Sequence, residues 1–212
     1  MLAIIQLDMR RSKQDKAASH ERIVNTAAAR IRESGIDQPG VAEIMRDAGL
    51  THGGFYKHFD SREELIDAAV KRALTENEPT VARMVQDADD PLASFADWYV
   101  STAHRDDPAH GCGVVALGAD VSRVGGTRQE AYRAQVDHYL AHLQSLMDGD
   151  DEDSRKRASV TLSAMVGAVT IARALGPTPR SEELLRDVRE AVRERRLLVD
   201  YPHRRTTLPA SA

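Results

Sequence analysis

Apolar residues recur every three or four positions along most of this chain, a period that belongs to helices rather than to strands. Between residues 19 and 34, Ile23, Ala27 and Ile31 recur at four-residue spacing, and Gly35 follows where a glycine commonly ends a helix. The helical period returns in the later segments, and none of them forms a convincing strand. We therefore expect an all-α fold of about nine helices.

Composition agrees with a helical, soluble protein. The 212 residues are rich in alanine, and aromatic residues make up only 4% of them. Alanine favours helices, whereas aromatic side chains favour strands. Because Cys112 is the only cysteine, no disulfide forms within the chain, and we expect a reducing, cytoplasmic compartment. No run of about 18 apolar residues is present, so we expect no membrane-spanning helix.

Both ends of the chain are expected to be flexible. Residues 1–16 are predicted to form a basic arm that is either solvated or in contact with the phosphates or the minor groove of DNA. The apolar opening leaves translation from Met1 or from Met9 as alternatives. The tail 201–212 is predicted to be disordered.

Two short helices joined by a tight turn are the most informative local pattern. Residues 40–48 and 51–59 each have one apolar face, and Gly49 between them suits a positive φ. This arrangement is typical of the helix-turn-helix, in which the second helix enters the major groove of DNA. The distribution of charge also favours nucleic-acid binding by the N-terminal part, because residues 1–72 carry +1 whereas residues 73–212 carry −5.

The second short helix should bury one face and expose the other. Phe55 and Phe59 are four residues apart, so they share the face that we expect to be buried. Gly53 and Gly54 weaken the helix, which makes sense if its backbone approaches DNA closely. The remaining side chains suit phosphate oxygens and base edges; they are Thr51, His52, Tyr56, Lys57 and His58.

The segment Leu50–Phe59, LTHGGFYKHF, followed by SREEL at 61–65, resembles the DNA-binding domain of the TetR/AcrR family. The resemblance covers residues 17–77 and implies an N-terminal three-helix DNA-binding domain. Residues 78–200 would then form a larger helical domain for ligand binding and dimerisation. The implied function is a one-component transcriptional regulator, a repressor that a small organic ligand releases from a palindromic operator. An activator of the same fold, ligand-independent or ligand-requiring, is the alternative.

The resemblance also implies contacts to DNA. Matched by position, the DNA-binding residues are Gly40, Thr51, His52, Gly53, Gly54, Tyr56, Lys57, His58 and Arg62. Those at the start of the recognition helix would read bases, whereas Tyr56 and Arg62 would meet phosphate. The family usually opens its second helix with hydroxyl residues, but Pro39 and Gly40 stand there in this chain. Gly40 can serve as the N-cap, yet a hydroxyl contact to phosphate is missing.

Apolar stripes on the last two helices, expected over 153–175 and 181–199, predict a dimer interface. The resemblance implies that this pair packs with its partner's as a four-helix bundle. Two recognition helices roughly 34–36 Å apart then fit successive major grooves. Alternatively, the stripes fill only the core of the subunit. The predicted interface residues are Leu162, Val166, Leu184, Val188 and Val192.

Aromatic and soft apolar side chains of the C-terminal part are the candidates for an effector pocket, because organic ligands bind in apolar cavities with a few polar groups. Each is alternatively an ordinary core residue. The candidates are Trp98, Tyr99, Cys112, Leu117, Tyr132, Tyr139, Met165 and Val169.

Catalysis and metal binding are not expected. The sequence shows no nucleophile–histidine–acid set, no phosphate-binding loop and no regular metal-ligand spacing, so we expect no cofactor. A metal site built from His104, His110, Cys112, His138 and His142 is the alternative, as is oxidant sensing by Cys112. The expected partners are operator DNA, a second copy of the chain and a small-molecule effector, with no membrane.

Overall fold

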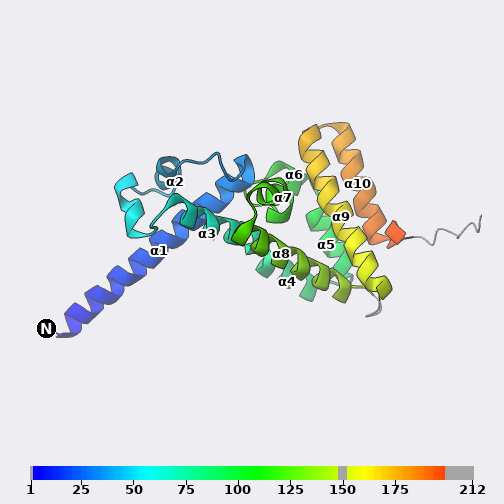
Figure 1. Cartoon of the computed structure of the whole chain (residues 1–212). Coiled ribbons are helices and arrows are strands. Elements are labelled where there is room, and N and C mark those ends of the chain that lie inside the picture. Colours follow the sequence, from blue (N-terminus) through cyan, green and yellow to red (C-terminus); the bar gives the residue numbers. More distant parts are fainter. Residues whose placement is uncertain (1, 148–151, 199–212) are drawn as a thin grey trace, which may run out of the picture.

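The computed structural model describes residues 2–147 and 152–198, and these residues form helices and connecting turns without any strand. The all-α prediction is confirmed, with ten α-helices and two 3₁₀ helices in the described part of the chain (Figure 1). The helices are α1 (Leu2–Ser34), α2 (Val41–Asp47), η1 (His52–Lys57), α3 (Arg62–Thr75), α4 (Glu78–Gln86), α5 (Pro91–Tyr99), α6 (Thr102–Asp106), α7 (Gly113–Val124), α8 (Gly126–Ser145), α9 (Glu152–Leu175), α10 (Pro179–Arg193) and η2 (Arg196–Leu198).

The N-terminal unit consists of α1, α2, η1 and α3. Helix α3 packs along α1, and α2 contacts both α1 and η1. Ile23, Ile31, Ile44 and Leu65 are each fully buried between these helices, as the helical period predicted. This shared core holds η1 at the outer end of the molecule (Figure 1).

Helix α1 is longer than the sequence pattern indicated. We expected a flexible arm over 1–16 and a helix from about residue 19, but one helix runs from Leu2 to Ser34. Residues 2–18 contain neither glycine nor proline and consist mostly of good helix formers, so nothing interrupts the helix. The extension projects from the body of the molecule (Figure 1).

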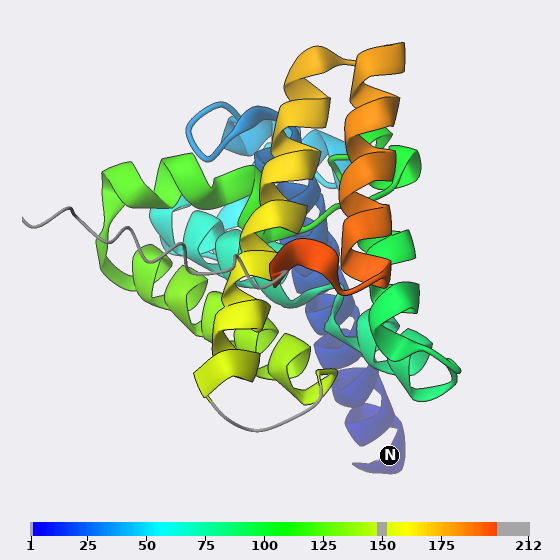
Figure 2. The same ribbon diagram turned by 90° about the vertical axis from the view of Figure 1, so that its right-hand side faces the viewer.

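The C-terminal unit, α4 to α10, is built around α9. Helix α9 contacts α6, α7, α8 and α10, and α10 also packs on α5. Figure 2 shows α9 and α10 side by side on the face that is turned toward the viewer. By length and composition α9 is apolar enough to cross a membrane, which we did not expect, but core helices of folded domains pass the same test. The packing of α9 on four helices is that of such a core helix.

Side-chain caps set two helix boundaries that the sequence pattern missed. A helix was predicted from Asp90 to about residue 104, but it ends at Tyr99 because Ser101 caps a new helix, its Oγ accepting from the His104 backbone N–H at 3.1 Å. The last helix begins at Pro179 rather than at Ser181. Thr178 is its N-cap, and Ser181 completes the capping box two residues inside the helix.

The two units meet where α3 lies against α7 and α8. Arg128, at the start of α8 and 8% exposed, pairs with Glu63 and Asp67 on α3. The first residue of α7 is Gly113, and a Cβ there would lie 2.4 Å from the Ala73 carbonyl oxygen of α3. Only glycine permits this close approach of α7 to α3.

Candidate nucleic-acid interface

The predicted second helix of the helix-turn-helix is a 3₁₀ helix, η1. Gly49 adopts a φ of +72° in the turn before it, and the Leu50 N–H donates to the Met45 carbonyl at 2.8 Å. Phe55 and Phe59 are 2% and 3% exposed and stack at 5.7 Å, so the predicted inner face is confirmed. The 3₁₀ form fits a six-residue segment with two glycines, because glycine is a poor α-helix former.

The opposite face of η1 points into solvent. Tyr56 is 72% exposed, with its ring edge-on to Phe55 at 5.2 Å. Gly54 is half-buried, and the predicted contact residues that are exposed are Thr51, His52, Gly53, Tyr56 and Lys57. Four polar groups are therefore exposed on the side of η1 opposite the buried phenylalanines: the Tyr56 phenol, the His52 imidazole, the Thr51 hydroxyl and the Lys57 ammonium group.

His58 differs from the prediction, because its ring is half-buried. Its Nδ1 is buried without a hydrogen-bond partner in the described structure, and its ring centre is 6.1 Å from that of His20 on α1. Burial lowers the pKa of His58, and the charges of His20, Lys16 and Lys57 lower it further. His58 therefore links η1 to α1 and offers only part of its ring to a ligand.

Arg62 makes hydrogen bonds within the subunit, and its predicted phosphate contact stays a prediction. Its guanidinium donates to the carbonyl oxygens of Ile36 at 3.0 Å and Asp37 at 3.2 Å, so it ties the α1–α2 loop to the start of α3. Ser61 caps α3, since its Oγ accepts from the Glu64 N–H at 3.1 Å. Gly40 is the N-cap of α2, as expected. It is exposed and has no side chain with which to cap the helix.

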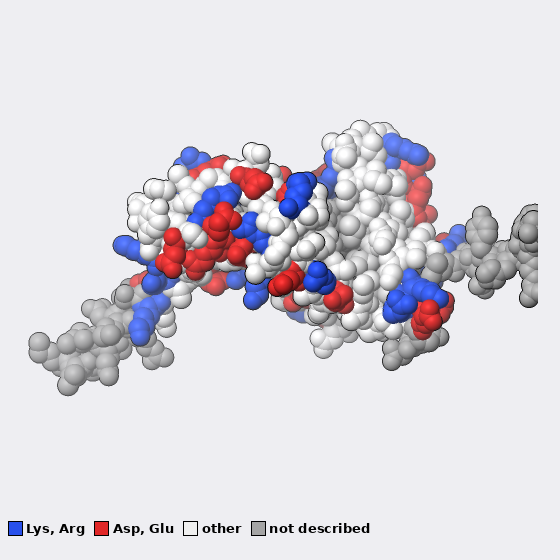
Figure 3. All heavy atoms as spheres, viewed as in Figure 1, with Lys and Arg blue, Asp and Glu red and all other residues white. Residues whose placement is uncertain are grey.

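A basic groove runs between α1 and η1. Its open volume is about 730 Å³. Helix α1 contributes Lys13, Lys16, Ala17, His20 and Glu21 to the lining, and Lys57 and His58 line the other side. Figure 3 shows Lys and Arg along the exposed part of α1. Sequence reasoning missed His20, because no motif links it to η1. A helical α1 places Lys13 and Lys16 beside Lys57, which a flexible arm would not.

Comparison with known proteins identifies this unit. The family profile described as "Bacterial regulatory proteins, tetR family" matches residues 23–69, which include α2, η1 and most of α3. The N-terminal unit is therefore a DNA-binding domain of the TetR type.

Curated relatives match the N-terminal part of this chain. The transcriptional repressor BepR of Brucella suis is 34% identical over 65 residues, 31% of each chain. The regulator TtgR of Pseudomonas putida is 30% identical over 86 residues, 40% of each chain. The match thus spans between 30% and 40% of the length of the curated relatives.

Solved structures of the family match over both units. A TetR regulator from Chloroflexus aurantiacus has 23% identity and a TM-score of 0.73, with 85% of this chain and 97% of that chain covered. The reduced form of NemR from E. coli has 20% identity and a TM-score of 0.69, with coverages of 84% and 96%. These likenesses show that the C-terminal unit shares the family's fold.

The predicted effector residues are half-buried or fully buried. Trp98 and Tyr132 are half-buried, and the Tyr132 hydroxyl donates to the Val114 carbonyl at 2.9 Å. Six others are at most 2% exposed and lie in the core, where the Cys112 thiol donates to the Tyr139 hydroxyl at 3.6 Å. These six are Tyr99, Cys112, Leu117, Tyr139, Met165 and Val169. Their apolar surfaces pack α5, α7, α8 and α9 together, and their role in effector binding stays a prediction.

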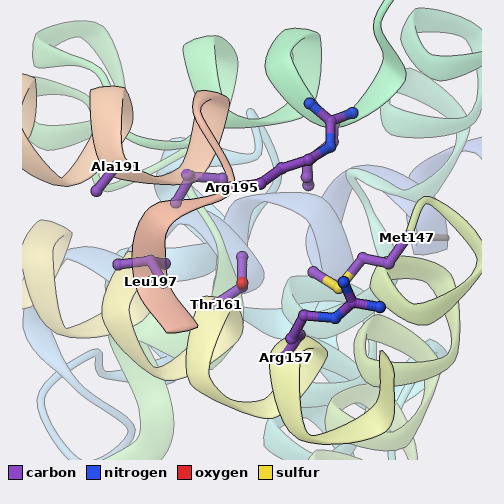
Figure 4. A pocket seen from close by; sticks show the side chains of 8 residues that line it. Met147, Arg157, Thr161, Ala191, Arg195 and Leu197 are labelled. Atoms are coloured by element: carbon purple, nitrogen blue, oxygen red, sulfur yellow. The ribbon is translucent and has the colours of Figure 1, made fainter. Parts of the chain in front are cut away.

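The groove in Figure 4 lies instead between α5, α9, the end of α10 and η2. Its open volume, with solvent-filled space included, is about 400 Å³, and its lining is mainly apolar. Arg157 pairs with Asp153 at 3.4 Å and Arg195 with Asp90 at 3.3 Å, so both cations of the lining already have carboxylate partners. Its eight lining residues are Leu92, Met147, Arg157, Thr161, Ala191, Val192, Arg195 and Leu197.

The predicted dimer residues divide into two groups. Leu162 and Val192 are 6% and 2% exposed and belong to the subunit core, so their interface prediction is corrected. Val166, Leu184 and Val188 are half-buried and retain some free surface. The structure adds exposed residues that the sequence pattern missed: Val160, Ile171 and Leu175 of α9 are 36%, 51% and 42% exposed.

The exposed face of α9 carries little charge. No charged residue occurs from Ala158 to Ala172, and in Figure 3 the surface over the middle of this helix is almost entirely white. An uncharged, partly apolar helix face of this kind is typical of subunit interfaces.

The histidines of the alternative metal site are dispersed. No group of three or more His, Cys, Asp or Glu positioned for a metal ion occurs among the described residues. The His138 Nε2 lies 4.0 Å from the Glu78 carboxylate, whereas His142 packs edge-on against Phe95.

Proposed function

We propose that this chain binds operator DNA through η1 and regulates transcription from the bound site. The observation that carries the proposal is the exposed polar face of η1, with Tyr56 72% exposed above the buried Phe55 and Phe59. A short rigid element with donors on its free face fits the major groove, which is about 12 Å wide. Lys13, Lys16 and Lys57 supply the positive charge that phosphates attract.

The regulator acts as a homodimer in the cytoplasm. One η1 reads few base pairs, so two copies with a fixed spacing are needed for a specific site. The uncharged face of α9, with Val160, Ile171 and Leu175, supports dimerisation through α9, to which Leu184 and Val188 of α10 would add. The resulting twofold axis predicts a palindromic operator.

The preferred regulatory mode is repression that a small organic ligand relieves. Support comes from the similarity of the N-terminal unit to the repressor BepR, and from a C-terminal unit that bears open grooves. A coupling of about 1–3 kcal/mol between ligand and DNA would change operator affinity 5- to 150-fold. An activator of the same fold is the alternative, and transcription from a selected site in the presence of the protein distinguishes the two.

The test begins with selection of binding sites from random duplexes by the purified protein. Fluorescence anisotropy then measures affinity for the selected duplex. Lys57→Ala and Tyr56→Phe should weaken binding about fivefold or more, because each loses a contact to the duplex. Lys156→Ala is the matched control, since Lys156 is an exposed lysine of α9 that pairs with Glu152.

Two results would contradict the proposal. One is a selection that enriches no common sequence. The other is equal DNA affinity for Lys57→Ala and Lys156→Ala, with circular dichroism showing that both variants are folded.

A further inference from the structure

A second open groove lies where the N-terminal and C-terminal units meet. Residues of α1, α6, α7 and α9 line it, and its open volume is about 860 Å³. Figure 1 shows α6 and α7 between the end of α1 and α9. Three arginines contribute to its walls, namely Arg32, Arg105 and Arg173.

Two of these arginines are fully engaged within the protein. Arg32, 4% exposed, donates to the Glu76 carboxylate and to the Ala109 carbonyl oxygen, both at 2.6 Å. Arg105, 5% exposed, donates to the carboxylate of Asp106 and to the Ser181 hydroxyl. A carboxylate therefore balances each of these charges.

Arg173, in the last turn of α9, is different. One Nη donates to the His104 carbonyl at 2.8 Å, but the buried Nε has no hydrogen-bond partner, and no carboxylate pairs with this guanidinium in the described structure. Burial lowers the pKa of Arg173, against the smaller opposing effects of Cys112, Tyr99 and Asp107, and the charge of Arg32 also lowers it. A half-buried guanidinium without a carboxylate partner is costly, so an anion in contact with it in the groove would be favourable.

The backbone leaves room for this guanidinium. A Cβ at Gly111 would lie 2.5 Å from the Arg173 Nη2 and 2.9 Å from a ring carbon of His104. Because Gly111 has no side chain, the Arg173 guanidinium can lie directly against the backbone at this position, beside the groove.

The other lining residues define what kind of anion fits. Val115 and Ala116 of α7 are half-buried and supply apolar surface. Glu33 and Asp106 also line the groove, so a ligand with several negative charges would be repelled. We propose that this groove binds a small organic monocarboxylate, with its carboxylate on Arg173 and its apolar part against Val115 and Ala116.

The position of the groove gives the ligand a way to act on DNA binding. Arg32 and Glu33 belong to α1 of the N-terminal unit, whereas Arg173 belongs to α9. A bound carboxylate would favour one placement of the two units over others. By contrast, no residue of α1, α2, η1 or α3 lines the groove in Figure 4. This regulatory consequence rests on the proposed function, but the binding site does not.

Benzoate is a suitable probe, because it is an apolar monocarboxylate, and benzamide is its neutral counterpart of the same shape. Isothermal titration and the melting temperature of the full chain should show that benzoate binds and stabilises the protein, whereas benzamide does not. Equal stabilisation by benzamide, or no binding of benzoate at 10-millimolar concentration (roughly ten times a millimolar Kd), would overturn the proposal. Stabilisation by inorganic phosphate alone would overturn the assignment to an organic carboxylate.

Two variants of one residue test the location. Ala116→Asp places a carboxylate in the groove, and Ala116→Asn places a neutral side chain of the same size there. Benzoate affinity should fall about tenfold or more in Ala116→Asp relative to Ala116→Asn, because two like charges in a partly buried site repel. Equal affinities in the two folded variants would show that benzoate binds elsewhere.

Measurements of DNA affinity distinguish the benzoate site itself from the effect of benzoate on DNA binding. With the selected duplex, benzoate should change the affinity of the wild-type chain and of Ala116→Asn, but not that of Ala116→Asp. Normal benzoate binding with unchanged DNA affinity would refute the regulatory role. Failure of all DNA binding would refute the proposed function and would not affect the benzoate titrations.

Discussion

The backbone N–H of Cys112 donates a hydrogen bond to Nε2 of His104 at 2.9 Å. Since Nε2 accepts this bond, the ring proton is on Nδ1, which lies 2.7 Å from the Tyr99 carbonyl oxygen and donates to it. A neutral imidazole thus joins the end of α5 to the start of α7. Protonation would place a second hydrogen on Nε2 and break the bond from Cys112.

This relationship predicts a loss of stability in mild acid. Burial lowers the pKa of His104 from 6.5 to about 4, against the smaller opposing effect of the Tyr99 carbonyl; nearby charges are Arg173, which lowers it, and Asp107, which raises it. Between these two values the unfolded chain binds a proton that the folded chain does not. The free energy of unfolding should therefore fall by about 2 kcal/mol between pH 7 and pH 5 from this group.

Urea unfolding at both pH values checks the prediction, with His104→Gln as the comparison. The variant should be less stable at pH 7 but should lose less stability on acidification, because glutamine does not titrate. An equal loss in the two proteins would show that carboxylates alone account for the acid sensitivity.

The basic groove predicts a specific salt dependence of DNA binding. Lys16 lies in this groove with Lys57, so it should contact a phosphate of a duplex bound to η1. In Lys16→Ala the slope of log affinity against log salt should become shallower by about one unit, with weaker binding to all sequences. Anisotropy titrations at several salt concentrations measure the slope. An unchanged slope would mean that α1 does not reach the duplex.

Two residues of α9 differ in exposure, and this difference predicts opposite consequences of mutation. Ile171 is 51% exposed and Leu162 only 6% exposed. Ile171→Glu should convert the dimer to a monomer in sedimentation experiments, while the subunit stays folded. Leu162→Ala should leave the dimer intact but lower the free energy of unfolding by about 2–5 kcal/mol, because it creates a core cavity. The reverse pattern would place the interface on another surface.

The ion pairs of Arg128 predict a moderate contribution to the junction of the two units. The side chains of Glu63 and Asp67 are 65% and 48% exposed, so they would be solvated after the arginine is removed. Arg128→Ala should cost about 1–2 kcal/mol, less than loss of one partner from a fully buried pair. It should also raise the pKa of Glu63, which the hydrogen bond from Arg128 lowers.

Urea unfolding and carboxyl NMR titration measure these two effects. Arg123→Ala is the control, because Arg123 is 66% exposed and pairs with Asp120 on its own helix, where such a pair contributes about 0.5 kcal/mol. Equal losses in the two variants would show that Arg128 makes no special contribution to the junction.

The amino-acid sequence by itself determined most of the helical segments and the position of the helix-turn-helix. The period of Ile23, Ala27 and Ile31, and the spacing of Phe55 and Phe59, depend only on helix geometry, so they could be read without the fold. Capping at Ser61 and Asp90 was predictable for the same reason, since a cap involves residues three positions apart.

Tertiary structure alone decided which apolar residues are core and which are surface. Every side of α9 is uncharged from Ala158 to Ala172, so periodicity could not show that Leu162 faces inward while Ile171 faces solvent. Periodicity also could not show the contacts of Arg62, His58 and Arg173, because their partners come from segments distant in sequence. A helical pattern records the polarity of a segment's faces, whereas the neighbour that covers each face is set by the packing of the whole chain.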